Sequence, residues 1–343
     1  MTVKRSLAPH VRTETSVRTM MGDVVVALLF VLVIPTVYYG PRVLVLAGVT
    51  VGVCMLCELL FALITHMPLR ATDFSSVVTG LLISLLMPPN IDLWVPVIAG
   101  MFAILVAKMP FGGTGRAPFN PAAAGFVFVS VCWPEKVFFY LDPLRLKGQL
   151  PLFGDCTGVL EGTSPAALLQ RGLRPKSTVE NILLGRFPGA MGTTLVLVLL
   201  ACGLYLVIRR TANWDSAAVY LAVCAAWAAV SPRIVGTRRE SVFFELTSGA
   251  LVFCAVFLVT EPSTSPRTRT GRCLYGLLAA LVTMAMRSFG SYEEGGCFAI
   301  LLVNSLTPAL DRAAWRLTHQ ITMQNARKIF HRFRQRGGKL HEA

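Results

Sequence analysis

The sequence predicts an all-α polytopic membrane protein with about ten transmembrane helices, arranged as two inverted five-helix repeats. Hydrophobic residues make up 54% of the 343-residue chain and charged residues only 15%, whereas a soluble domain carries about a quarter charged residues. The apolar residues lie in ten separate blocks, as expected for a chain that crosses a lipid bilayer many times. A polar stretch of more than fifty residues divides these blocks into five and five.

Each apolar block is expected to form one membrane helix. Several blocks are shorter than the roughly 17–25 residues of a full crossing. Short segments beside Pro and Gly are tolerated in a membrane only where protein surrounds the backbone, so we expect them inside the bundle. The ten blocks are residues 24–39, 43–66, 77–87, 93–107, 120–133, 189–208, 217–230, 246–260, 273–286 and 296–310.

The blocks define five regions of the chain. Because each half has an odd number of spans, a repeat has to be inverted in the membrane, and inverted repeats with Gly- or Pro-interrupted segments at matching positions are typical of ion and solute translocators. Chance similarity between two apolar stretches is the alternative. The regions are an N-terminal segment (1–22), the first repeat (23–133), an exterior loop (134–188), the second repeat (189–310) and a basic tail (311–343). The matching pairs are Thr79-Gly80 with Ser248-Gly249, and Phe111-Gly112 with Phe289-Gly290.

The distribution of basic residues predicts the orientation. With the N-terminus in the cytoplasm, 20 of the 32 Lys and Arg residues lie on the cytoplasmic side. Seven of the other 12 belong to the long loop, and long segments cross a membrane largely regardless of charge. Both termini are therefore expected in the cytoplasm. The +14 net charge is explained by cytoplasmic loops and by a basic tail that lies on anionic lipid or contacts a partner subunit, and no nucleic-acid partner is expected.

Two features of the apolar region are candidates for chemistry, whereas no motif for a dinucleotide, a phosphate loop or a metal is present. Glu58 lies inside an apolar segment, where a charge needs a polar interior or a partner. It belongs either to an ion path or to a helix-packing contact, protonated or paired. The glycines of residues 111–115 precede Arg116 and a helix start at Asn120. Such a helix start can hold an anionic group, and a re-entrant turn is the alternative.

Motifs along nearly the whole chain resemble one family. They are residues 8–12 (APHVR), 77–82 (VVTGLL), 87–89 (MPP), 111–113 (FGG), 120–122 (NPA), 260–262 (TEP), 292–295 (YEEG) and 308–312 (PALDR). In this order they resemble RnfD, a membrane subunit of the Rnf ion-translocating electron-transport complex, which is related to the NqrB subunit of the Na⁺-translocating NADH:quinone reductase. The short segment before the first span favours the Rnf subunit.

The resemblance implies an FMN that is bound covalently through its phosphate to a hydroxyl side chain of the exterior loop. The family motif reads Ser/Thr-Gly-Ala-Thr, and aligning it on Gly162 and Pro165 places Ser164 at the attachment position, with Thr163 as the fallback. This chain departs from the motif: Glu161 replaces Ser/Thr, Thr163 replaces Ala, and Gly158 stands where an acid is expected. The same residues also predict a helix N-cap at Ser164 with Pro at the first turn.

The resemblance also implies a function and partners. The protein would pass electrons through the loop-bound FMN, because no side chain can do so, and couple ferredoxin/NAD chemistry to Na⁺ or H⁺ movement. It would not be active alone. Its partners would be the lipid bilayer, the other Rnf membrane subunits, above all the flavin-bearing RnfG subunit, and an FMN transferase. Its location would be a bacterial inner membrane. The alternatives are a flavin-free channel or transporter, a quinone-reductase subunit, and an assembly scaffold with a decayed flavin site.

Overall fold

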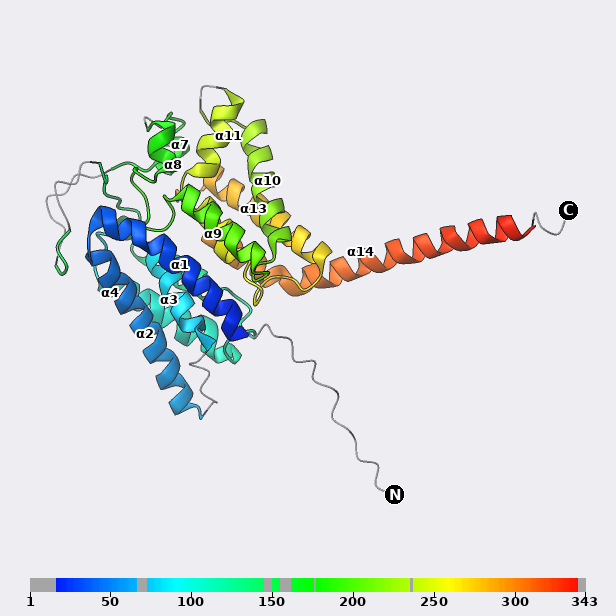
Figure 1. The fold of residues 1–343 in the computed structure, drawn as a ribbon, viewed down its shortest axis with the longest axis horizontal. Coiled ribbons are helices and arrows are strands. Elements are labelled where there is room, and N and C mark those ends of the chain that lie inside the picture. The colour runs from blue at the N-terminus through cyan, green and yellow to red at the C-terminus, as the bar shows by residue number, and fades with distance from the viewer. Residues whose placement is uncertain are drawn as a thin grey trace, which may run out of the picture.

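The computed structural model describes residues 17–66, 73–144, 150–154, 162–175, 177–234, 237–290 and 292–338, without the side chains of 319–338. Its regular elements are all helices (Figure 1). The first half contains α1 (Val17–Tyr39), α2 (Arg42–Ile64), α3 (Ser75–Leu86), α4 (Trp94–Phe102) with its continuations η2 (Ala103–Lys108) and η3 (Met109–Phe111), and α5 (Pro121–Cys132). The second contains α9 (Val196–Ile208), α10 (Trp214–Val230), α11 (Arg238–Thr247), α12 (Leu251–Phe253), η4 (Cys254–Leu258), α13 (Arg269–Phe289) and α14 (Gly296–Gly338). The connecting loop has only short helices, α6 (Pro134–Val137), α7 (Pro165–Gln170) and α8 (Val179–Leu183), in its described part.

The helices form a multi-pass membrane protein. Among the described residues, five helices are long and apolar enough to cross a membrane, and the bent pair of α11 with α12 and η4 makes a sixth. Four further helices, α3, α5, α9 and α10, are apolar but only 10–17 residues long. Every predicted apolar block therefore coincides with a helix or a helix pair, while the count of ten spans stays a prediction.

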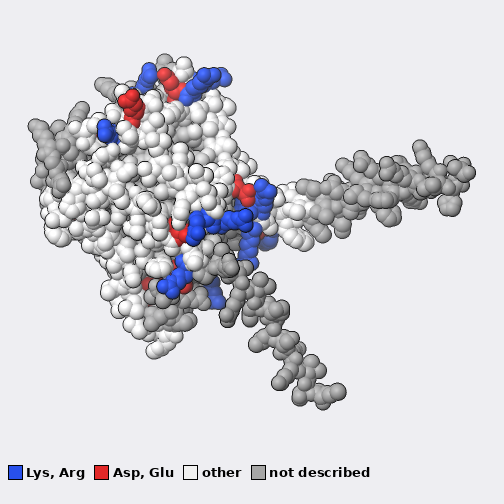
Figure 2. Space-filling view, viewed as in Figure 1, with Lys and Arg blue, Asp and Glu red and all other residues white. Residues whose placement is uncertain are grey.

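The surface agrees with a membrane environment. On the face shown in Figure 2, charged side chains gather at one end of the molecule and around the base of α14, and the area between them is largely uncharged. Large apolar side chains are exposed along α1 and α2, as lipid contact requires. They include Leu29, Phe30, Val33 and Val37 on α1, and Leu56, Leu59, Leu60 and Leu63 on α2.

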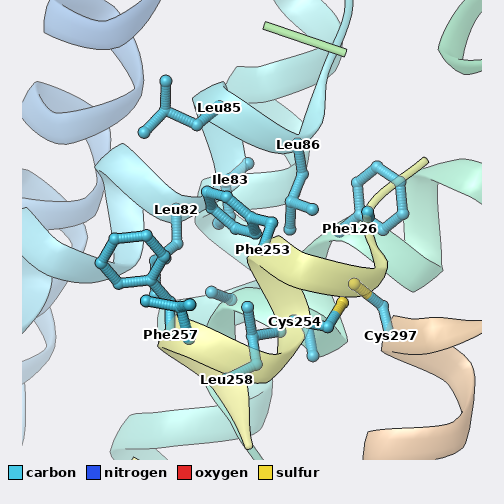
Figure 3. Close-up of a cluster of buried hydrophobic side chains, with 14 of the residues drawn as sticks. Leu82, Ile83, Leu85, Leu86, Phe126, Phe253, Cys254, Phe257, Leu258 and Cys297 are labelled. Carbon is cyan, nitrogen blue, oxygen red and sulfur yellow. The ribbon is translucent and has the colours of Figure 1, made fainter. Parts of the chain in front are cut away.

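Two short interrupted helices, one from each half, occupy the centre of the bundle. Every residue of α3 except Val77 is buried, and so is every residue of α12 and η4. Figure 3 shows leucine side chains of α3 against phenylalanine and leucine side chains of α12 and η4, with the free thiols of Cys254 and Cys297 facing each other. The prediction that short segments lie inside the bundle is confirmed for these two.

The breaks between helices leave backbone groups that need partners. At the end of α3, the Gly192 N–H donates to the Leu85 carbonyl oxygen over 2.7 Å and the Met191 N–H to that of Met87 over 3.0 Å. The chain from residue 189 to 195 therefore binds the end of α3, and the helix predicted from residue 189 begins only at Val196. A tertiary contact thus replaces the first two turns of the predicted helix.

Arg42 satisfies most of the remaining carbonyls at this break. Its side chain is buried at 1% exposure. The guanidinium donates to the carbonyl oxygens of Pro89, Ile91, Pro151 and Gly154 over 2.9–3.0 Å. Because a planar guanidinium has five N–H donors, this one residue ties the end of α3 to the exterior loop.

Two predicted elements differ from the structure. The block at 246–260 is interrupted at Gly249, whose φ of 68° is left-handed, and the two helical parts meet at 64°. The tail was expected as a separate helix on the membrane surface, and this was wrong at its start, because α14 runs without interruption from the apolar block through Pro308 to Gly338. In Figure 1 this helix extends far beyond the bundle.

Helices approach each other closely where one of them carries a glycine. A side chain at Gly80 of α3 would lie 2.7 Å from the Cα atom of Val51 in α2, and one at Gly125 of α5 would overlap the Ala99 carbonyl of α4. Small residues at helix crossings are typical of membrane bundles, because dispersion contacts between backbones replace the hydrophobic effect.

We predict that Gly80→Ala destabilises the fold by roughly 1–3 kcal/mol, since the added methyl group forces α2 and α3 apart. The matched control is Gly48→Ala in α2, where nothing lies within 4 Å of the added carbon. That variant should be neutral or more stable by up to about 1 kcal/mol, because alanine favours helix. Thermal unfolding in detergent measures both, and equal midpoints for the two variants would contradict the close approach.

Candidate functional site

A buried lysine lies at the centre of the candidate site in the first half. The Lys108 Nζ atom, at the end of η2, donates to the Glu58 carboxylate over 2.9 Å and to the hydroxyl oxygens of Ser75 and Ser76 over 2.7 Å and 3.1 Å. The Lys108 and Glu58 side chains are only 2% and 8% exposed. Ser75 and Thr114 also share a hydrogen bond of 2.8 Å. We call Glu58, Ser75, Ser76 and Lys108 the Lys108 cluster.

The Lys108 cluster separates two hollows. On one side, Glu58 and Ser76 line an apolar groove of about 370 Å³ between α2 and α3. On the other side, Ser75 and Lys108 line a polar cavity of about 30 Å³, which has room for about two water molecules. Of the alternatives for Glu58, the structure places the residue in a buried ion pair that has a hollow on each side.

The start of α5 lines the same cavity. Asn120 caps this helix by accepting the Ala123 N–H over 3.1 Å, and its amide donates to the carboxylate of Glu261 from the second half. Burial raises the pKa of the Glu261 carboxyl, and hydrogen bonds from Ser263 and Asn120 and the charge of Lys108 act against this. The helix start predicted to hold an anion therefore faces a carboxylate of the chain itself.

Arg116 lies apart from these groups. Its side chain is exposed and folds over Gly112, whose φ is 98°. Arg116 is not among the residues that line the polar cavity. The structure thus brings Glu58 and Asn120 to opposite sides of Lys108 but leaves Arg116 at the surface.

The second half contains a related cluster built on arginine. Arg287, near the end of α13, donates to the carbonyl oxygens of Glu245 and Ser248 over 3.1 Å and 2.9 Å. It also lies 3.3 Å from the Glu245 carboxylate, which Arg233 contacts as well. We call these four residues the Arg287 cluster. It satisfies the backbone at the break between α11 and α12, as Arg42 does after α3.

The exterior loop is fixed where the flavin site is predicted. Gly162 donates its N–H to the Tyr140 carbonyl over 3.0 Å, and any side chain at this position would overlap Pro188. Ser164 caps α7 by accepting the Ala167 N–H over 3.0 Å, which confirms the predicted N-cap. Its hydroxyl also donates to Glu293. Glu161 and Gly158, two of the departures from the family motif, lie outside the described residues.

The two predicted attachment hydroxyls differ in accessibility. Thr163 is exposed, whereas Ser164 is 5% exposed and faces the Glu293 carboxylate. A phosphate on Ser164 would face that negative charge, so in this conformation the Ser164 surroundings fit a flavin phosphate only if Glu293 moves. The exposed Thr163 hydroxyl fits without rearrangement. Among the described residues, no three His, Cys, Asp or Glu side chains gather as a metal site would require.

Comparison with known proteins places the chain in a family. A model described as the NQR2, RnfD, RnfE family matches residues 4–318. The chain belongs to this family. The resemblance predicted from the motifs is thereby confirmed, and the family match includes both clusters and the exterior loop.

Relatives of this NQR2, RnfD, RnfE family member carry names that agree, since each is the subunit designated D of its complex. The relative from the Na(+)-translocating ferredoxin:NAD(+) oxidoreductase complex of Acetobacterium woodii is 31% identical over 310 residues, which are 90% of this chain and 92% of the relative. The relative from the proton-translocating ferredoxin:NAD(+) oxidoreductase complex of Clostridium ljungdahlii is 29% identical, covering 90% and 93%. The relative from the ion-translocating oxidoreductase complex of Alcanivorax borkumensis is 31% identical, covering 91% and 95%.

Sequence reasoning missed the partners of the predicted residues. Lys108 counts as a loop cation in the sequence because the apolar block ends at residue 107, and Glu261, Arg287 and Glu293 count only as parts of motifs or loops. One signal is available. Lys108 and Arg287 each stand two or three residues before a Phe-Gly pair that matches between the halves.

Glu294, in the loop before α14, is predicted to make stability depend on pH. Burial raises the pKa of its carboxyl from 4.5 to about 7, although Arg287 and the Ala250 N–H favour the charged form. The folded state then binds the proton more tightly than the unfolded chain. Stability should therefore fall as pH rises from about 4.5 to about 7, by on the order of 3 kcal/mol, and stay level above that.

Glu294→Gln should remove this part of the pH dependence, because the amide oxygen still accepts the Ala250 N–H but does not titrate. Thermal midpoints of the wild type and the variant, measured between pH 4.5 and 7.5, give the difference. Glu261 and Glu293 titrate in both proteins and cancel. Parallel pH profiles for the two proteins would show that Glu294 is not responsible.

Proposed function

We propose that this protein is a membrane subunit of an Rnf-type electron-transport complex, which couples ferredoxin/NAD redox chemistry to the movement of Na⁺ or H⁺ across a bacterial inner membrane. The family match over residues 4–318, with relatives over about nine-tenths of the chain that are named as subunits of such complexes, carries this proposal. Relatives are named for Na⁺ and for protons, so the cation has to be determined for this chain.

The proposed topology is ten spans in two inverted repeats, with both termini in the cytoplasm. Two related clusters support it: the Lys108 cluster lies where α2 ends and α3 begins, and the Arg287 cluster lies where α11 and α13 end. In Figure 1, the free end of α2 and the helix α11 lie at opposite ends of the bundle. Inversion of one half relative to the other predicts this placement.

The exterior loop is proposed to carry covalent FMN, attached by a transferase to Ser164, with Thr163 as the fallback. The alignment on Gly162 and Pro165 supports Ser164, and the tight packing of Gly162 explains why a glycine is needed there. Bound FMN would supply one-electron chemistry that side chains lack. Exposure favours Thr163, because a transferase has to reach the hydroxyl. The flavin-bearing RnfG subunit is the proposed exchange partner on this side.

A second candidate function is a flavin-free channel or transporter with the same inverted plan. The polar cavity and its buried charges favour this interpretation as much as they favour an ion path in a redox complex. The two functions differ at the loop, because a transporter has no need of a modified hydroxyl there.

The flavin is tested by expressing the full chain with its transferase and viewing flavin fluorescence on a denaturing gel. A fluorescent band that Ser164→Ala abolishes and Thr163→Ala retains is the expected result. The reverse pattern moves the attachment to Thr163. A dark wild-type band, with the transferase active on a known substrate protein, would reject the flavin and leave the transporter or scaffold.

Glu58→Gln should leave flavin content and electron flow intact and reduce ion uptake by proteoliposomes that contain the complex at least several-fold. The reason is that a neutral amide neither pairs with Lys108 nor attracts a cation. Asp92→Asn, which removes the partner of exposed Lys136, is the control for loss of an acidic group. Uptake equal to the wild type would make Glu58 purely structural.

A further inference from the structure

The oxygen atoms around Lys108 have the composition of a small cation site. One carboxylate and two hydroxyl groups meet at the ammonium over 2.7–3.1 Å, in a place that is almost closed to solvent. Hard cations such as Na⁺ take oxygen ligands of these types. The Lys108 ammonium therefore occupies the position that a free monovalent cation would take between α2 and α3.

The corresponding group in the second half is an arginine, and the difference is chemical. The Arg287 guanidinium is fixed by backbone carbonyls of Glu245 and Ser248 as well as by the Glu245 carboxylate. Lys108 is bound only by side chains, and an ammonium on a four-carbon chain can reorient without breaking a planar fork of hydrogen bonds. The Arg287 cluster is thus built to stay closed, and the Lys108 cluster can exchange its cation.

A second carboxylate is available to Lys108 across the polar cavity. Lys108 and Glu261 line this cavity together with Ser75, Thr79 and Asn120, and the charge of Lys108 already acts on the Glu261 carboxyl. The cavity offers hydroxyl and amide oxygens along the way. A swing of the flexible side chain therefore takes the ammonium from one buried carboxylate to another.

We propose that Lys108 is a tethered cation that competes with a monovalent metal cation for the site made by Glu58, Ser75 and Ser76, and that it moves to Glu261 when the metal cation binds. This inference rests on the proposed function and names the site, the ligand class and the competing group. The groove beside Glu58 and Ser76 is the side from which the cation reaches the site.

Charge balance makes the exchange feasible in a low-dielectric interior. Before exchange, Lys108 neutralises Glu58; after it, the metal cation neutralises Glu58 and Lys108 neutralises Glu261. A buried charge without a partner is strongly destabilising, and neither end state requires one at the Lys108 cluster. No covalent bond or redox change is involved. A cation can thus enter only when the ammonium leaves, which prevents an open leak.

The test uses thermal unfolding of the purified full chain in NaCl and, at equal ionic strength, in choline chloride. A ligand that binds only the folded state raises the midpoint by mass action. Lys108→Gln removes the competitor, so its midpoint should rise in NaCl with an apparent Na⁺ affinity at least tenfold higher than in the wild type. Lys108→Arg keeps a cation in place and should show no Na⁺-specific rise.

Two further variants complete the test. The double variant Glu58→Gln with Lys108→Gln should lose the Na⁺ response. Glu261→Gln should lower the apparent Na⁺ affinity of the wild type, since the ammonium then has no second carboxylate. A Lys108→Gln midpoint that is equal in NaCl and choline chloride overturns the competition. If Lys108→Gln does not fold, an unchanged Na⁺ response in Glu261→Gln overturns the exchange on its own.

These outcomes are separate from those of the proposed function. Thermal midpoints require no flavin, no partner subunit and no electron flow. A chain without flavin that still shows Na⁺ binding in Lys108→Gln would keep the site and reject the redox role. A flavin-bearing chain without Na⁺ competition would keep the redox role and reject the tethered cation.

Discussion

The structure depends on one constraint of the membrane interior: every backbone group freed by a broken helix needs a partner inside the protein. The two central helical segments both end in the bundle, and a buried arginine binds the carbonyl oxygens at each break. Arg42 binds four carbonyl oxygens after α3, and Arg287 binds two between α11 and α12. These arginines make it possible for short helices to lie at the centre of the fold.

Short central helices in turn create polar space within an apolar bundle. The starts of α3 and α5 and the residues after η4 place hydroxyl, amide and carboxylate groups around one cavity beside Lys108. A continuous helix would have satisfied its own backbone groups and left no such space. The Arg287 cluster, where the corresponding cation is held by main-chain oxygens, shows the closed form of the same arrangement.

Much of the fold was predictable because hydrophobicity is a local property. Each of the ten apolar blocks is helical, and the N-cap at Ser164 follows from its own neighbours. Three features were not predictable in this way. The bend at Gly249, the late start of α9 and the continuous α14 depend on contacts or on the absence of a stop signal.

The sequence by itself determined that the chain is helical, crosses a membrane, belongs to its family and buries an acid at Glu58, because composition and motif order are written along the chain. Only the tertiary structure decided which charges meet. Glu58 and Lys108 are fifty residues apart, Asn120 and Glu261 come from different halves, and Ser164 meets Glu293 across 129 residues. Such pairs follow from how helices pack, and hydropathy carries no information about which helix faces which.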